Sequence, residues 1–104
     1  MDFAQLMGLA SGHAEARIVQ TAVELGIFDA IESTPLAAAA VASELRLNQQ
    51  AVELLLNALT ALGLLEKHRQ VFSLTEISRR HLLRDSPHYA GAMIGFDAML
   101  WSAW

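Results

Sequence analysis

Four histidines are the side chains of this sequence best suited to acid–base chemistry or metal binding: His13, His68, His81 and His88. A zinc-binding helix places two histidines four residues apart with an acidic neighbour, and no pair of these four has that spacing. The chain has no cysteine, so it offers no thiolate nucleophile or thiolate metal ligand. It also lacks the G-x-S-x-G turn of a serine hydrolase. We therefore expect surface or helix-capping histidines, no catalytic residue and no metal site in this chain.

The glycines do not suggest a cofactor-binding loop. A dinucleotide or S-adenosylmethionine pocket usually begins with a glycine-rich turn directly after a strand, where bare backbone approaches the ligand. The glycines here fall inside predicted helices or at their ends instead, at positions 8, 12, 26, 63, 91 and 95. We expect no cofactor site in this chain.

Composition narrows the class of partner. The net charge is −4 with seven Lys and Arg residues, which disfavours a nucleic-acid surface because phosphates require basic patches. No apolar run reaches the roughly 20 residues of a membrane-spanning helix, and no secretory signal precedes the first helix. The sequence predicts a cytoplasmic protein that binds neither nucleic acid nor membranes. Its apolar content of 54% exceeds what one small core needs, which indicates that another chain or domain covers some helix faces.

Periodicity and cap signals predict mainly helices. Apolar residues at helical spacing predict a long first helix over 3–25, which Gly26 ends before a short helical turn. Thr34-Pro35 is an N-cap and first-turn signal for a helix over about 36–46. Asn48 is the predicted cap of the next helix, over about 49–62, which Gly63 ends.

A β-hairpin and two further helices are predicted downstream. Residues 64–67 and 71–74 flank a polar stretch and predict the hairpin, with Phe72 and Leu74 facing inward. Thr75 is the predicted cap of a helix over about 76–83 with Ile77, either His81 or Leu82, and Leu83 on its apolar side. Ser86-Pro87 is predicted to open a last helix to Trp104. Helix, helix and hairpin predict a mainly α winged helix-turn-helix with a small β-hairpin wing and extra terminal helices, folded as one domain over 1–104.

A winged helix raises the hypothesis of a DNA-binding transcription regulator. Reading bases requires Arg, Lys, Asn or Gln on the second helix of the pair, with cations nearby for the phosphates. Residues 48–62 contain no Lys or Arg, and their one charge is Glu53; Arg79, Arg80 and Arg84 are more simply a solvated face. The regulator stays as the alternative function. A membrane-surface role for residues 91–104 has less support, because no basic polar face accompanies the apolar one.

Five blocks of sequence carry a family resemblance: ELGIFDAI at 24–31, VASEL at 41–45, LLNALTALGLLE at 55–66, VFSLT at 71–75 and LRDSP at 83–87. Together they resemble the N-terminal dimerisation region of the plant-type, small-molecule S-adenosylmethionine-dependent O-methyltransferases. The resemblance implies a winged-helix module that has lost DNA binding and forms a homodimer through intertwined terminal helices. It also implies a Rossmann-like methyltransferase domain downstream, which would hold the S-adenosylmethionine and the general-base histidine. The parent protein would methylate a hydroxylated small molecule in secondary (natural-product) metabolism, and this chain alone would not be an enzyme.

The same resemblance implies functions for the terminal helices. Trp104 is similar to a tryptophan that the family carries shortly before the catalytic domain, in a helix that helps to line the acceptor pocket. The candidate acceptor-lining residues are Phe96, Met99, Leu100 and Trp104, with packing in a core or an interface as the alternative interpretation for each. The candidate dimer-interface residues are Phe3, Leu6, Met7, Ala10, Ala14, Ile18 and Met93.

Overall fold

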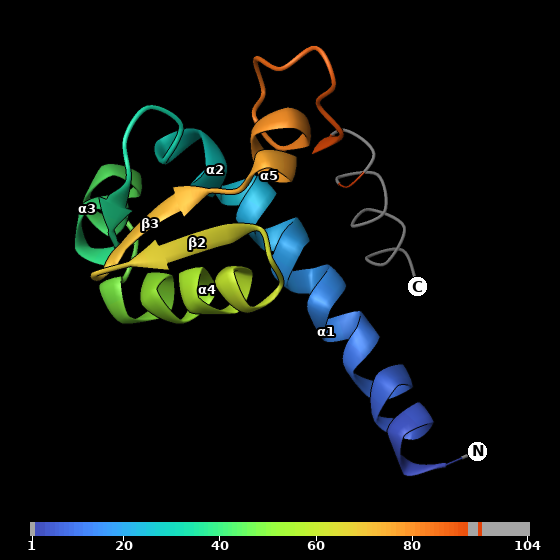
Figure 1. The fold of residues 1–104 in the computed structure, drawn as a ribbon. Helices are drawn as coiled ribbons and strands as arrows, with labels where there is room; N and C mark the ends of the chain where they lie inside the picture. The colour runs from blue at the N-terminus through green and yellow to red at the C-terminus, as the bar shows by residue number, and fades with distance from the viewer. Residues whose placement is uncertain (1, 92–93, 95–104) are drawn as a thin grey trace.

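The computed structural model describes residues 2–91 and 94, except for the side chains of residues 4, 5 and 7–14. The elements of this part of the chain, shown in Figure 1, are α1 (Phe3–Leu25), α2 (Ile27–Ala30), β1 (Leu36–Ala37), α3 (Ala38–Leu45), α4 (Gln49–Ala61), β2 (Leu65–His68), β3 (Val71–Leu74) and α5 (Glu76–His81). This order confirms the predicted mainly α, winged-helix-like fold with its small hairpin wing.

The sheet has a third strand that the sequence did not predict. Strand β3 is central and pairs antiparallel with both β1 and β2, and Leu36 and Ala37 of β1 lie opposite Phe72 and Val71. The prediction that Thr34-Pro35 opens a helix at residue 36 was therefore wrong. Helix α3 begins after Ala37, which makes no side-chain capping bond, because the free edge of β3 offers backbone partners that outweigh the helix propensity of Ala37.

The hairpin is confirmed, and its turn is built without glycine. Arg69 and Gln70 both have positive φ, 50° and 68°, which is the backbone of the tight turns that suit twisted hairpins. Each left-handed non-glycine residue costs roughly 1–2 kcal/mol. Phe72 and Leu74 face inward as predicted, with 1% and 5% of their surface exposed, so burial of the strand offsets the strain of its turn.

Helix α4 begins and ends where the sequence predicts. The side chain of Asn48 accepts a hydrogen bond of 2.9 Å from the backbone N–H of Ala51, which satisfies one of the free donors of the first turn. Gly63 follows the helix with a φ of 84°, a left-handed conformation that favours glycine. Figure 1 shows α4 running along the hairpin, so this helix covers one side of the sheet.

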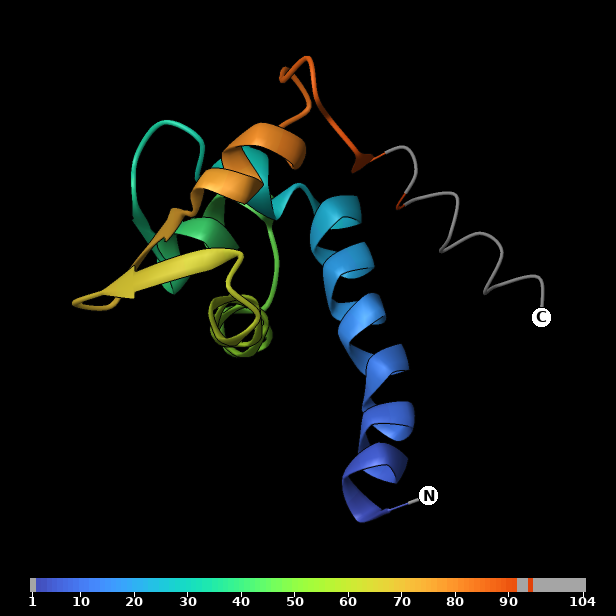
Figure 2. The same cartoon turned by 45° about the vertical axis from the view of Figure 1, so that its right-hand side comes forward.

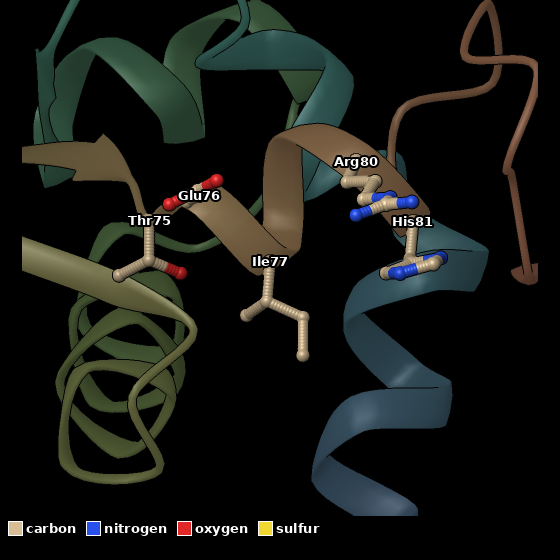
Figure 3. A pocket seen from close by; sticks show the side chains of 5 residues that line it. All are labelled: Thr75, Glu76, Ile77, Arg80 and His81. Atoms are coloured by element: carbon tan, nitrogen blue, oxygen red, sulfur yellow. The ribbon is translucent and has the colours of Figure 1, made fainter.

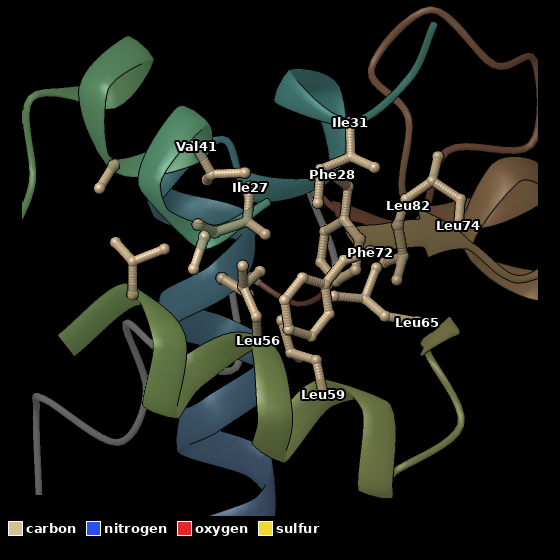
Figure 4. Close-up of a cluster of buried hydrophobic side chains, with 14 of the residues drawn as sticks. Ile27, Phe28, Ile31, Val41, Leu56, Leu59, Leu65, Phe72, Leu74 and Leu82 are labelled. Atoms are coloured by element: carbon tan, nitrogen blue, oxygen red, sulfur yellow. The ribbon is translucent and has the colours of Figure 1, made fainter. Parts of the chain in front are cut away.

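The core lies between the sheet and helices α2, α3 and α4. Figure 4 shows Phe28 and Phe72 side by side at its centre, surrounded by aliphatic side chains from these helices and from β2. The largest fully buried side chains are Phe28, Phe72, Ile27, Ile31, Leu56, Leu59, Leu65, Val41 and Ser78. Each of the three helices and the hairpin therefore contributes to one continuous apolar cluster.

Helix α5 differs from its prediction in which side chains it buries. Ile77 is 56% exposed, whereas Ser78 is fully buried. The Ser78 hydroxyl donates to the Leu64 carbonyl oxygen at 2.6 Å, and the Thr75 hydroxyl donates to the same oxygen at 3.1 Å. Thr75 occupies the N-cap position of α5 but makes no side-chain capping bond to it. The helix ends at His81 instead of residue 83, and the buried Leu82 and Leu83 follow it.

The predicted start of the last helix at Ser86-Pro87 was also wrong. These two residues lie in a turn, and helical backbone is described from Gly91. The Ser86 hydroxyl donates to the carbonyl of Arg80 and accepts from the backbone N–H of His88 at 3.3 Å. These bonds close a local turn instead of capping a helix. Apart from Ile94, which is also helical, the rest of the predicted last helix lies outside the described residues.

A candidate dimerisation surface

Helix α1 is long and has two different environments, and we call its first half the arm. Its second half packs against α2 and α4, with Ala22 fully buried. Its first half projects away from the other described elements, as Figure 1 and Figure 2 show from two directions. Phe3 is 76% exposed and Leu6 is 53% exposed. Because burial of such a side chain is worth about 1.5–3 kcal/mol, this end of the arm is a candidate site for a partner.

The other predicted interface residues divide into three groups. Ile18 is half-buried and packs against the core of its own subunit. The residues Met7, Ala10 and Ala14 belong to α1, and their side chains are not described. Met93 lies outside the described residues, as do the acceptor-lining candidates Phe96, Met99, Leu100 and Trp104.

A groove between α1 and α4 was not predicted from the sequence. It encloses about 360 Å³ and is lined by Thr21, Leu25, Leu47, Asn48, Ala51, Val52 and Leu55. Most of these side chains are apolar, and Leu25 is 37% exposed. The lining residues come from two segments more than 20 positions apart in the sequence, so no local pattern predicts the groove. A sequence signal for it would have been Leu25 and Leu55, two apolar side chains that the core does not fully bury. The groove is a mainly apolar hollow on the surface of α1 and α4.

The exposed face of α4 lacks the features of a DNA-recognition helix. Its outward residues include Glu53 and Leu54, and Leu54 is 73% exposed. Lys67 of the wing donates a hydrogen bond to the Asn57 side chain at 3.0 Å, and its ammonium lies 5.2 Å from the centre of the Phe72 ring. A recognition helix needs cations directed at phosphates, and this wing cation is directed at its own subunit.

The arginines after the wing are exposed, as the sequence indicated, and they also connect elements. Arg84 forms an ion pair with Asp29 at 3.4 Å, and its backbone N–H donates to the same carboxylate at 3.1 Å. Arg79 donates to the Glu32 carbonyl at 3.4 Å. These contacts hold α5 and the segment after it against α2, which is a structural function.

The histidines show no arrangement for catalysis or metal binding in the described part of the chain. His68 is exposed on the wing. His81 Nδ1 lies 3.0 Å from the His88 carbonyl oxygen, and the described residues contain no group of His, Cys, Asp and Glu that could hold a metal ion. A hollow of about 460 Å³ along α5 includes His81 and Arg80, which lie beside each other in Figure 3, with Ile77 pointing out from the helix.

None of the described helices is long and apolar enough to cross a membrane.

Comparison with known proteins gives a consistent set of similarities. A family model described as the O-methyltransferase dimerisation domain matches residues 7–84. A 3-hydroxy-5-methyl-1-naphthoate 3-O-methyltransferase from Streptomyces sahachiroi is 32% identical over 89 residues, which cover 86% of this chain and 26% of that protein.

Two solved structures have closely similar folds. An O-methyltransferase family protein from Burkholderia thailandensis superimposes with a TM-score of 0.91 and 28% identity, covering 100% of this chain and 31% of that one. Human N-acetylserotonin methyltransferase in complex with SAM gives a TM-score of 0.87 and 31% identity, covering 94% of this chain and 30% of that one. The chain therefore spans less than a third of the length of these relatives.

Proposed function

Because the chain belongs to the O-methyltransferase dimerisation domain family, we propose that it joins two copies of a parent O-methyltransferase into a homodimer. The observation that supports this most directly is the exposure of Phe3 and Leu6, 76% and 53%, at the projecting end of α1. Side chains of this size gain stability only when something covers them. A second copy that buries both arms would supply that cover.

The relatives support a proposal for the activity of the parent protein. They are methyltransferases about three times as long as this chain, and one of them was solved with SAM. We propose that the parent transfers a methyl group from S-adenosylmethionine to a hydroxyl group of a small molecule. Cofactor binding and catalysis would belong to a downstream domain, so this chain alone would be inactive.

The last helix predicted from the sequence is proposed to contribute to the acceptor pocket through Phe96, Met99, Leu100 and Trp104. Apolar and aromatic side chains line most small-molecule pockets, and these four supply that chemistry. In the parent enzyme, Met99→Ala would raise the KM for the acceptor and leave the KM for S-adenosylmethionine unchanged. Equal effects on both substrates, or on neither, would contradict a lining function.

The alternative function, a winged-helix regulator that binds DNA, has less support because α4 carries no Lys or Arg and the net charge is −4. A fluorescence titration with random duplex DNA at low salt separates the two functions. We expect no binding. Salt-dependent binding of the duplex would favour the regulator, since release of counterions from phosphates drives that association.

Sedimentation equilibrium tests the homodimer directly. We expect the mass of a dimer at chain concentrations of about 10 µM, because interfaces of stable homodimers bury on the order of 2,000 Å² or more. A folded monomer at that concentration, with the helix content of the intact fold by circular dichroism, would contradict the proposal.

A further inference from the structure

We infer that the exposed face of α5 around Ile77 is the surface against which the downstream methyltransferase domain of the parent protein packs. This inference rests on the proposed function and names the partner of a second surface, separate from the arm. Three observations carry it: the outward position of Ile77, the hollow beside it, and the place of α5 next to the helical backbone that begins at Gly91.

Ile77 is held at the surface by the contacts of its neighbours. Ser78 is fully buried, and its hydroxyl donates to the Leu64 carbonyl oxygen at 2.6 Å. The Thr75 hydroxyl donates to the same oxygen at 3.1 Å. These two bonds fix the rotation of α5 about its axis, so Ile77 points out from the helix (Figure 3) and stays 56% exposed.

An isoleucine outside and a serine inside reverse the usual order of burial. Burial of an isoleucine side chain is worth about 1.5–3 kcal/mol, and α5 gains little of this free energy within the described part of the chain, because Ile77 is more than half exposed. Places where the local sequence pattern and the fold disagree are expected at functional sites. A partner that covers Ile77 would supply the missing burial.

The hollow beside Ile77 has the mixed chemistry of a contact between domains. It encloses about 460 Å³ and is lined by Thr75, Glu76, Ile77, Arg80 and His81. The single ion pair of the described residues lies elsewhere, between Arg84 and Asp29, so the charges of Glu76 and Arg80 are open to a partner. Interfaces between domains of one chain are more polar than those of obligate subunits, which fits an apolar centre with charged neighbours.

The position of α5 favours the downstream domain over a second copy. The Ala90 N–H donates to the His81 carbonyl oxygen at 2.8 Å, so the chain returns to the end of α5 just before Gly91. The free end of α1 lies far from α5 in both Figure 1 and Figure 2. A copy bound to the arm therefore leaves α5 uncovered.

The sizes also agree. The relatives are about three times as long as this chain, and a domain of about 200 residues is about 40 Å across. As the helix predicted from the sequence, residues 91–104 would span about 20 Å at 1.5 Å per residue. A domain that follows this helix is wide enough to reach back to α5.

Thiol labelling tests this contact, because residues 1–104 contain no cysteine. Ile77→Cys is compared in the 104-residue chain and in the parent protein, and the label at position 77 is measured by mass spectrometry after digestion. We expect labelling in the parent to be slower by at least about tenfold, because the reagent reaches a covered thiol only when the domains separate. The matched control is Leu54→Cys on α4, at a side chain that is 73% exposed, which should react equally fast in both proteins.

Hydrogen exchange of the two unmodified proteins does not depend on the cysteine variants. The backbone amides of residues 76–81 should exchange more slowly in the parent than in the 104-residue chain, because the contact opposes local opening of α5. The amides of α4 around Leu54 are the reference and should change less.

The outcomes separate this inference from the proposed function. Equal labelling of Ile77→Cys in the two proteins, with equal exchange over α5, overturns the contact and leaves the homodimer intact. Slow labelling already in the shorter chain means that a second copy or the chain's own last residues cover Ile77, which also overturns the contact. A folded monomer by sedimentation, together with slow labelling in the parent, overturns the homodimer and leaves the contact intact. A parent protein without a methyltransferase domain overturns both.

Discussion

Two phenylalanines of this chain have opposite surroundings. Phe28 in α2 is 1% exposed, and Phe3 in α1 is 76% exposed. Both lie on helices with apolar faces, so residue type and periodicity alone do not separate them. The difference is that α2 is enclosed by α3, the sheet and the segment after α5, whereas the first half of α1 projects beyond them (Figure 2). The second half of α1 and the elements from α2 to the segment after α5, which we call the body, bury a complete core of their own. The arm keeps Phe3 and Leu6 exposed.

A single helix connects these two regions. The second half of α1 belongs to the body through Ala22, which is fully buried, and the first half belongs to the candidate interface. The same helix therefore contributes to subunit folding through its second half and to the candidate interface through its first half, with different residues in each. Substitutions in each region should change different measured quantities.

The largest effect is expected from Phe28→Ala. Removal of a fully buried ring leaves a cavity, which lowers the free energy of unfolding by about 3–5 kcal/mol. Denaturant unfolding followed by circular dichroism measures this loss. The loss in free energy of unfolding should be the same at all chain concentrations at which the oligomeric state is constant. A loss no larger than that from a substitution at an exposed position would contradict the buried position of Phe28 in Figure 4.

Phe3→Ala should act on association instead of on the subunit. We expect the dissociation constant of the dimer to rise, because each copy loses about 1.5–3 kcal/mol of apolar burial, with the helix content nearly unchanged. Sedimentation at several concentrations measures the shift. Leu54→Ala is the control, since Leu54 is as exposed as Phe3 but lies on α4; an equal shift in both variants would remove the distinction between arm and body.

Asn48→Ala should have a smaller effect, confined to the body. The lost bond to the Ala51 N–H lowers the free energy of unfolding by about 1 kcal/mol. Asn48→Asp is the comparison, because it keeps a side-chain acceptor for the Ala51 N–H and should change stability less. If the two variants unfold at the same denaturant concentration, Asn48 does not act as a cap.

Asp29→Asn should have the smallest effect. The amide keeps an acceptor for the Arg84 N–H and loses the charge that pairs with the guanidinium, and the Arg84 side chain is 57% exposed. Pairs as exposed as this contribute about 0–1 kcal/mol. The loss should disappear in about 1 M salt, where charges are screened within about 3 Å; a loss that persists would show a packing function.

The sequence predicted those features of the fold that depend on local chemistry. The Asn48 cap, the glycine after α4 and the alternation of Phe72 and Leu74 were each confirmed, because caps, left-handed stops and strand faces are determined within a few residues. The long first helix was confirmed from its apolar spacing alone.

Features that depend on distant partners were missed. Strand β1 exists because β3 offers a free edge to Leu36, and Ser78 replaces Ile77 in the interior because its hydroxyl reaches the Leu64 carbonyl. The groove lies between α1 and α4, two helices that are distant in the sequence, so no local sequence pattern predicts it. Of the candidate interface residues, Phe3 and Leu6 are exposed, and their function at a dimer interface stays a prediction. The acceptor-lining positions stay predictions.

The joint between α1 and α2 at Gly26 helps to set the direction in which α1 projects. Gly26 has a φ of 77°, and a Cβ there would meet open space, so backbone strain alone opposes any other residue at this position. The second half of α1 packs against α2 and α4 on the other side of this joint, so the joint and the packing together fix the direction in which the first half of α1 projects. A residue other than glycine at position 26 would strain the chain at the point that sets the direction of the exposed end with Phe3 and Leu6.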